Sequence, residues 1–194
     1  MDSIHKTIHR RLNIRGTLSN PFYAYRRGRD HLAMLFNDLG YKYGVEVGSH
    51  AGLYAECMCK ANPGLRLVCV DPYTDYFHHP ESQMVEAMEA AKARLASYDV
   101  SFIRKPSLGA VKEFSDDSLD FVYIDAMHDF DNVILDLIAW IPKVRRGGIV
   151  SGHDYRKRTD YGVVEAVDAY ARAHDIKTYY VTCEMRDPSW LWVR

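Results

Sequence analysis

The sequence predicts an α/β fold, in which a doubly wound sheet of seven mostly parallel strands ends in an antiparallel hairpin strand. Short, nearly continuously apolar runs, such as 43–48 and 118–125, have the composition of strands that are buried on both faces. These runs alternate with segments of helical periodicity, which indicates βαβ units with helices on both sides of a parallel sheet. Only "EMRDP" separates the last two strands. Because this segment is too short for a crossover helix, we expect those two strands to be antiparallel neighbours.

The elements of the first half are defined by apolar runs and by residues that end helices. "YGVEVG" at 43–48 is a predicted strand, and the helix expected over 52–64 is closed by Pro-Gly. A second strand covers 65–72. In the long helix expected over 81–98, methionine, alanine and leucine residues recur at helical spacing and form a stripe that faces the core.

The second half continues this alternation to the closing hairpin. The expected elements are a strand at 100–106, a short helix at 107–114, a strand at 118–125, a helix at 130–148, a strand at 147–155, a helix at 161–175, and strands at 176–183 and 188–194. Gly-Gly ends the helix at 130–148, and Pro142 bends its last turn. We expect Asp131 to cap the start of that helix. The alternating Trp190 and Trp192 are expected to pack against the sheet.

Residues 1–40 form a predicted N-terminal helical extension, and residues 41–194 form the main domain. "DHLAMLFNDLG" carries the helical pattern of the extension. The extension is expected to pack on the sheet or on a partner, and a second copy as partner would make the protein a homodimer.

Bulk composition narrows the classes of function. The formal net charge of −1 gives no general attraction to nucleic acid or to an anionic membrane, so neither partner is expected. No apolar run is long enough to span a membrane. Four cysteines without a pairing framework, together with an N-terminus unlike a signal peptide, predict a reducing, cytoplasmic setting.

Residues at the predicted strand ends suggest a ligand site. Gly48 and Gly52 follow the first strand, where glycine lets the backbone approach a ligand and turn sharply into a helix. Glu46, an acid inside that strand, favours a ligand that carries an amine or ammonium group. Asp71 ends the second strand and can accept both hydroxyls of a ribose, although a helix N-cap is the structural alternative. Ser107 follows the third strand and can bond an adenine edge.

The ordered set "VEVGSHAG", "VCVDPY", "KPSLGA", "LDFVYIDAMH" and "GGIVSGHDY", followed by a short antiparallel hairpin, resembles the class I S-adenosylmethionine-dependent methyltransferases. Within them the chain is most similar to the small-molecule O-methyltransferases that include the macrocin type, over residues 40–194. The resemblance implies S-adenosylmethionine as cofactor and a hydroxylated small molecule as substrate. It also implies a set of cofactor contacts. These are the methionine moiety at Gly48 and its neighbours Ser49 and Gly52, the ribose at Asp71 beside Pro72, the adenine at Ser107, and Asp125 bordering the cofactor.

The same resemblance implies a divalent cation at the ends of the fourth and fifth strands. Asp125, His153 and Asp154 occupy the positions of the metal ligands in metal-dependent members. The cation, Mn²⁺ or Mg²⁺, would lower the pKa of the substrate hydroxyl and orient it. His153 departs from the acidic pairs of those relatives, and imidazole suits manganese, iron or zinc better than magnesium. In the metal-free alternative, His128, His153 or both act as general base, with Asp125 also in the catalytic set.

Other functions remain open at this point. A nicotinamide-dependent oxidoreductase is disfavoured because His50 replaces the second glycine of G-x-G-x-x-G and the chain has no Tyr-x-x-x-Lys pair. A non-catalytic binding or interaction module on the same fold is a further alternative. Nucleic-acid methylation is weakened by the near-neutral charge. The basic loop 155–161 could recruit an acidic substrate or simply be solvated. The loop histidines His78 and His79 could line the substrate entrance, although exposed histidines are more often incidental.

Overall fold

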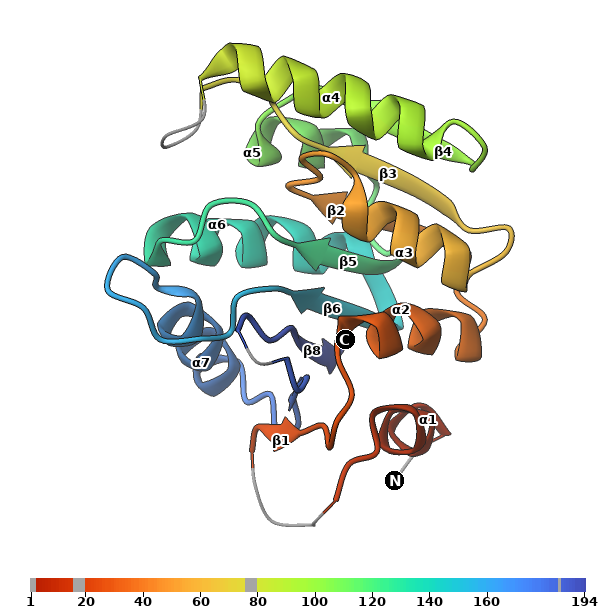
Figure 1. The fold of residues 1–194 in the computed structure, drawn as a ribbon. Coiled ribbons are helices and arrows are strands. Elements are labelled where there is room, and N and C mark those ends of the chain that lie inside the picture. The colour runs from red at the N-terminus through yellow and green to blue at the C-terminus, as the bar shows by residue number, and fades with distance from the viewer. Residues whose placement is uncertain (1–2, 16–19, 76–79, 185) are drawn as a thin grey trace.

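The computed structural model describes residues 3–15, 20–75, 80–184 and 186–194, which form one twisted sheet between two layers of helices (Figure 1). The strands are β1 (Phe22–Tyr23), β2 (Tyr43–Val47), β3 (Arg66–Val70), β4 (Val100–Ile103), β5 (Leu119–Ile124), β6 (Val144–Gly152), β7 (Tyr180–Val181) and β8 (Trp190–Val193). The helices are α1 (Ser3–Leu12), α2 (Arg29–Asp38), α3 (Leu53–Ala61), α4 (Glu81–Leu95), α5 (Ser107–Ala110), α6 (Phe130–Trp140) and α7 (Val163–Ala173).

The strand order is β1-β7-β8-β6-β5-β2-β3-β4, and β8 is the strand that runs antiparallel to its neighbours. The expected doubly wound, mostly parallel sheet with an antiparallel hairpin strand is therefore confirmed. The strand count needs a correction, because the sheet has eight strands and not seven. The additional strand, β1, comes from the N-terminal extension and pairs with β7 at the edge of the sheet. Its two residues are too few to show a periodicity of their own.

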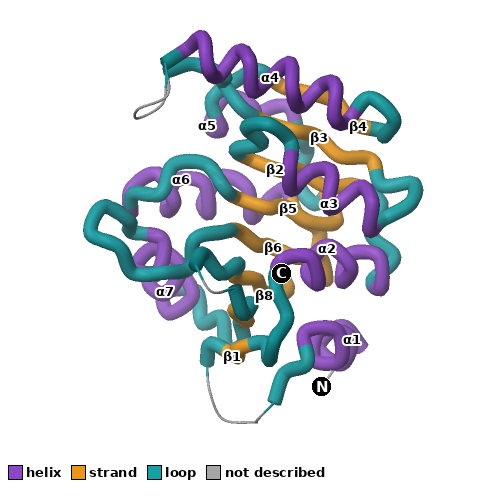
Figure 2. Tube along the Cα trace, in the orientation of Figure 1, coloured by secondary structure: helices purple, strands orange, loops and turns teal. Residues whose placement is uncertain are grey.

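Helices lie on both sides of the sheet (Figure 2), and one hydrophobic cluster packs on each face. Successive residues of a strand point to opposite faces, so Val45 and Val47 belong to the cluster under α5, α6 and α7. Phe121 and Tyr123 belong to the cluster under α1, α2 and α3. Both tryptophans of β8 are buried, as expected. None of the described helices is long and apolar enough to cross a membrane.

Several predicted boundaries are wrong around α6 and β7. The helix expected over 130–148 ends at Trp140, because a 3₁₀ turn containing Pro142 follows and β6 already begins at Val144. Asp129, not Asp131, is the N-cap, and its side chain accepts a hydrogen bond from the backbone N–H of Asn132. The strand expected at 176–183 is reduced to the two residues of β7.

The extension packs on the sheet of its own chain. Phe36 of α2 stacks on Phe121 of β5, with ring centroids 3.9 Å apart and planes 10° from parallel. Gly44 of β2 makes room for this contact, since a Cβ there would lie 2.2 Å from the Phe121 ring. Ile8 and Leu12 of α1 are buried in the same cluster. A boundary near residue 40 stays a proposal about domain organisation, and the core is continuous across it.

Candidate active site

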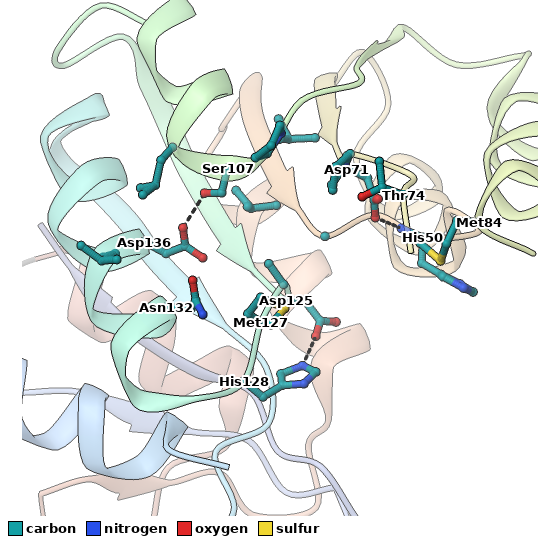
Figure 3. A pocket seen from close by; sticks show the side chains of 18 of the residues that line it. His50, Asp71, Thr74, Met84, Ser107, Asp125, Met127, His128, Asn132 and Asp136 are labelled. Carbon is teal, nitrogen blue, oxygen red and sulfur yellow. Dashed lines mark hydrogen bonds and ion pairs between the residues drawn. The ribbon is translucent and has the colours of Figure 1, made fainter. Parts of the chain in front are cut away.

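A pocket with a volume of about 440 Å³ lies at the carboxyl ends of β2, β3 and β5, bordered by α5 and α6 (Figure 3). Strand β2 is the point where the strand order reverses, with β3 on one side and β5 on the other. Ligands of doubly wound sheets bind at such a point. Of the predicted site residues, Gly48, Asp71, Pro72, Ser107, Asp125 and His128 line the pocket. Glu46, Ser49, Gly52, His153 and Asp154 are not among the described residues of its wall.

The turn after β2 presses against the end of β5. Gly48 has φ +90°, and a Cβ there would lie 1.9 Å from the carbonyl oxygen of Asp125. The N–H of Asp125 donates to the carbonyl of Val47 at 2.7 Å. Gly52, with φ +72°, then starts α3. Both glycines occupy the left-handed region that other residues rarely adopt, so the turn depends on them.

Asp71 holds this turn from the neighbouring strand end. Its carboxylate accepts hydrogen bonds from the backbone N–H groups of His50 and Tyr73, each at 2.9 Å. The Tyr73 hydroxyl in turn donates to the carbonyl of His50 at 3.0 Å. The alternative that Asp71 caps a helix is not what the structure shows, since α4 begins only at Glu81. Asp71 still lines the pocket and is available to a ligand there.

Ser107 and Asp136 form the opposite end of the pocket. The Ser107 hydroxyl donates to Asp136 Oδ1 and accepts a hydrogen bond from the indole N–H of Trp140 at 2.8 Å. Asp136 projects from α6 and is only 4% exposed. Burial raises its pKa to about 6, because the charged carboxylate loses its hydration there. This carboxyl group is therefore mostly ionised at pH 7 but takes up a proton at a higher pH than an ordinary aspartate.

Glu46 lies in β2 beneath the turn and is 2% exposed. Burial, assisted by the negative charge of Asp125, raises its pKa to about 8. The thiol of Cys69 lies 3.9 Å from the Glu46 carboxylate oxygen. Ser49 donates to the backbone carbonyl of Glu46 at 3.3 Å. At neutral pH Glu46 is thus mostly protonated in the ligand-free protein, and a nearby ammonium group would favour its ionised form.

Two acids and two histidines meet where β5 and β6 end. Asp154 Oδ2 lies 2.9 Å from His128 Nε2 and 3.3 Å from His153 Nδ1. Asp125 Oδ1 lies 3.6 Å and 3.7 Å from the same two nitrogen atoms. Asp154 has φ +58°, a conformation that aspartate tolerates better than most residues. The fold therefore brings together Asp125, His128, His153 and Asp154, the four residues that the sequence analysis named as candidate metal ligands or bases.

The four groups stabilise one another's charged forms. Burial works against the proton on each histidine, but the ion pairs with Asp125 and Asp154 outweigh it. The pKa of His128 rises to about 9 and that of His153 to about 10. Burial likewise works against the charge of the two acids, yet the histidines lower the pKa of both. Without another cation, the cluster holds two carboxylates paired with two imidazolium groups.

Three of these residues fit a divalent cation. One ligand atom each from Asp125, His128 and Asp154 can be chosen so that all lie within 4.8 Å of one another. The sequence predicted His153 in place of His128 in this set. His153 borders the cluster through its Nδ1, so its place among the ligands stays a proposal. Two carboxylate oxygens and one imidazole nitrogen form a donor set that suits manganese and neighbouring transition metals.

Sequence reasoning missed two charged residues of this region. Asp136 stands among apolar residues in "NVILDLIAW", and an acid inside an apolar stripe was the available signal. Arg29, at the start of α2, places its guanidinium carbon 5.1 Å from the centre of the Tyr54 ring. Burial works against the charge of Arg29, but its neighbours Tyr123 and Asp125 raise its pKa. No pattern in the extension pointed to this residue. His78 and His79 lie outside the described residues.

Residues 45–155 match the model of a family described as a methyltransferase domain. An uncharacterized protein of Sinorhizobium fredii is 26% identical over 123 residues, and the match spans 59% of this chain but only 13% of that protein. The O-methyltransferase TomG of Streptomyces achromogenes, solved with S-adenosylmethionine, is 16% identical with a TM-score of 0.64 over 100% of this chain and 90% of its own. An O-methyltransferase of Bacillus cereus, solved with S-adenosylhomocysteine, is 15% identical with a TM-score of 0.60 over 100% and 92% of the two chains. These likenesses establish a shared fold.

Proposed function

Because the chain belongs to the methyltransferase-domain family whose model matches residues 45–155, we propose that it transfers a methyl group from S-adenosylmethionine to a hydroxyl of a small molecule. The observation that supports this most is one pocket that joins Ser107 and Asp136 to Asp71 and, beyond it, to Asp125 and His128. Its volume of about 440 Å³ suits a cofactor of this size. The nicotinamide and interaction-module alternatives have no comparable support.

The nucleoside of the cofactor occupies the end of the pocket away from the histidines. Ser107 and Asp136 supply a hydroxyl and a carboxyl group for the adenine edge. Asp71, beside Pro72, faces the ribose hydroxyls while its carboxylate also holds the turn after β2. The apolar remainder of the wall, including Leu108, covers the base.

The methionine end lies against the turn that contains Gly48, Ser49 and Gly52. Its ammonium group faces Glu46 and Asp125, the two acids at the ends of β2 and β5. Glu46 is neutral in the empty protein and becomes charged when the ammonium approaches, since an opposite charge lowers the pKa of a buried carboxyl. The sulfonium is thereby presented beside Asp125 and the acid–histidine cluster.

Methyl transfer from a sulfonium has a good leaving group, so catalysis consists largely of positioning the acceptor and excluding water. A divalent cation held by Asp125, His128 and Asp154, with His153 beside it, would lower the pKa of the acceptor hydroxyl. The two carboxylates would balance the positive charge of the cation, and His128 would supply a nitrogen ligand.

The metal-free reading, in which His128 or His153 acts as general base, has less support. An imidazole that is already protonated cannot take the proton of the acceptor. Ion pairs with Asp125 and Asp154 favour the protonated form of both rings at neutral pH despite their burial. A divalent cation bound there would instead lower the pKa of the acceptor hydroxyl, so that no histidine would need to take its proton. The cytoplasmic setting and a homodimer stay predictions.

Isothermal titration of S-adenosylhomocysteine into metal-stripped protein tests whether the protein binds the proposed cofactor. Titration of Mn²⁺ and of Mg²⁺ tests whether it binds a divalent cation. We expect micromolar binding of the nucleoside, and a separate manganese heat that disappears in Asp125→Ala. Asp116→Ala is the matched control, because Asp116 is an exposed acid that pairs with Lys143. It should retain both heats.

Absence of S-adenosylhomocysteine binding under all metal conditions would overturn the proposed cofactor. Cofactor binding without any manganese heat would leave the methyltransferase proposal standing and reject only its metal. A manganese heat that persists in Asp125→Ala would place the ion elsewhere.

A further inference from the structure

The imidazole of His128 is useful in this site only at one orientation. His128 lies in the connection between β5 and α6, and its Nε2 atom faces Asp154 at 2.9 Å and Asp125 at 3.6 Å. Rotation about the side-chain bonds would turn Nε2 away from both carboxylates. His128 stands on a connecting segment, where helix or strand periodicity does not set the direction of a side chain, so packing against other segments decides the orientation of its ring.

Tyr161 lies directly against that ring. The centroids of the two rings are 4.7 Å apart and their planes are 15° from parallel. The guanidinium carbon of Arg158 lies 4.9 Å from the centre of the Tyr161 ring. An imidazole, a phenol and a guanidinium thus form a layered contact, in which flat groups restrict one another's rotation.

The segment that carries Tyr161 is attached to the connection between β5 and α6 through the next residue, Gly162. The N–H of Gly162 donates to the backbone carbonyl of His128 at 2.8 Å. Gly162 also lies so close to Phe130 that a Cβ would come within 2.4 Å of the Phe130 backbone nitrogen. The phenol ring and the backbone next to it therefore contact the same residue, His128, from one short segment.

The basic residues of this segment anchor it to the hairpin before β8. Arg156 and Arg158 each lie 3.6 Å from Asp187 Oδ1. Arg156 also donates to the carbonyl of Arg186 at 2.9 Å, and the N–H of Tyr155 donates to the carbonyl of Pro188 at 2.9 Å. The arginines that could have recruited an acidic substrate are thus engaged in holding the loop.

We infer that Tyr161, covered by Arg158 and anchored through Gly162, is a positioning residue that fixes the His128 ring with Nε2 toward Asp125 and Asp154. Tyr161 is not one of the metal-ligand residues. Its role resembles that of the outer-shell groups that orient the ligands of metal sites. The consequence for metal affinity rests on the proposed function, whereas the orientation of the ring does not.

The test compares Tyr161→Leu, which removes the stacking ring, with Tyr161→Phe, which keeps the ring and loses only the hydroxyl. In Tyr161→Leu we expect manganese affinity to fall by about tenfold to a hundredfold, the usual effect of losing an outer-shell partner. Tyr161→Phe should restore wild-type affinity. Both variants should bind S-adenosylhomocysteine in metal-free buffer as the wild type does. Tyr161→Leu with wild-type manganese affinity would overturn the inference.

Histidine NMR signals, assigned with His128→Gln, provide a readout that needs neither metal nor turnover. The His128 Nε2–H signal should be protected from exchange in the wild type and Tyr161→Phe, and lost in Tyr161→Leu. The matched control is Tyr170→Leu, because Tyr170 stacks on His174 at 4.1 Å in α7. This control should move the His174 signals alone. If the wild type binds no manganese, the metal proposal fails, and persistence of the protected signal in Tyr161→Leu would still refute the positioning role.

Discussion

Glu46 is a carboxyl group almost entirely removed from water, within a strand whose neighbours are apolar. In the ligand-free protein the free-energy cost of burying a charged carboxylate is avoided because Glu46 is protonated, since burial raises its pKa to about 8. Gly48, two residues later, is constrained in a different way, by the carbonyl of Asp125 that leaves no space for a Cβ. Both residues restrict the sequence at this position, Glu46 through its burial and Gly48 through the close approach of the turn to the end of β5.

Replacement of Glu46 by glutamine should stabilise the ligand-free protein at pH 8 by up to about 4 kcal/mol. The folded pKa of about 8 lies above the ordinary value of 4.5. Stability of the wild type is therefore fully present below about pH 4.5 and is lost as the pH rises toward 8. Urea unfolding at pH 4.5 and pH 8 measures this, and the difference between the proteins should vanish at the lower pH. Glu165→Gln, at an exposed position of α7, should show no such dependence.

Gly48→Ala should weaken S-adenosylhomocysteine binding by roughly tenfold or more, equivalent to about 1.4 kcal/mol. The added methyl group would displace the turn from the end of β5. Gly40→Ala is the matched control, because Gly40 has φ +72° with nothing within 4 Å of the added Cβ. Gly40→Ala places alanine at the same kind of left-handed backbone position but brings its Cβ into contact with nothing, so it should bind S-adenosylhomocysteine as the wild type does. Equal loss of binding in both variants would count against the close contact at Gly48.

Among the elements, α2 connects the N-terminal extension to the core of the sheet. Its buried face packs through Phe36 on Phe121 of β5, and its first residue, Arg29, lies near Tyr54 and Asp125. The extension therefore contributes both to folding and to the surroundings of the site. The basic loop before α7 is similar, since its arginines bind the β7–β8 connection while Tyr161 covers His128.

Phe36→Ala should reduce the free energy of unfolding by about 3–5 kcal/mol, the usual range for losing a buried aromatic ring. The ring is fully buried and stacked at 3.9 Å on Phe121. Met34→Ala, at a site 39% exposed on the same helix, should cost less than about 1 kcal/mol. Denaturant unfolding of the full chain measures both. A small effect of Phe36→Ala would show that the extension is dispensable to the core, and a truncation at residue 40 would then fold.

In the whole molecule, the candidate site is formed where the ends of β2, β3, β5 and β6 meet α5 and α6 at one edge of the sheet. Asp125 and His128 follow β5, and His153 and Asp154 follow β6. The parallel pairing of β5 with β6 brings these residues together. The four groups hold their charges only as a set, so their protonation influences the stability of the entire fold.

Stability of the metal-free protein should fall as the pH rises from about 7 to 10. The pKa values of His128 and His153 are raised to about 9 and about 10, above the ordinary 6.5. Their contribution is complete below about pH 6.5 and is lost as each proton leaves. Thermal unfolding of the wild type and of His128→Gln at pH 6.5, 8 and 9.5 isolates the contribution of His128 to stability. The difference in stability between the two proteins should shrink with rising pH. A constant difference would contradict the charge pairing. Saturating manganese should flatten the wild-type profile.

Local patterns in the sequence determined the order of strands and helices and the antiparallel end of the sheet. They also determined which strand ends carry acids, histidines and glycines. These features depend on residues within a few positions of one another. Apolar runs of strand length and the very short "EMRDP" connection restrict the chain regardless of what packs against it. Parallel pairing then requires that strand-end residues meet at one edge.

Only the tertiary structure decided the features that depend on contacts between distant segments. β1 exists because it pairs with β7, and α6 stops at Trp140 because β6 must begin at Val144 to pair with β5. Asp136 faces Ser107, and Tyr161 stacks on His128 rather than lying in solvent. Each of His128 and His153 faces both acids through one nitrogen, and this arrangement also depends on how two loops pack together. Side-chain direction on a loop has no periodicity, so it follows from packing and not from local sequence.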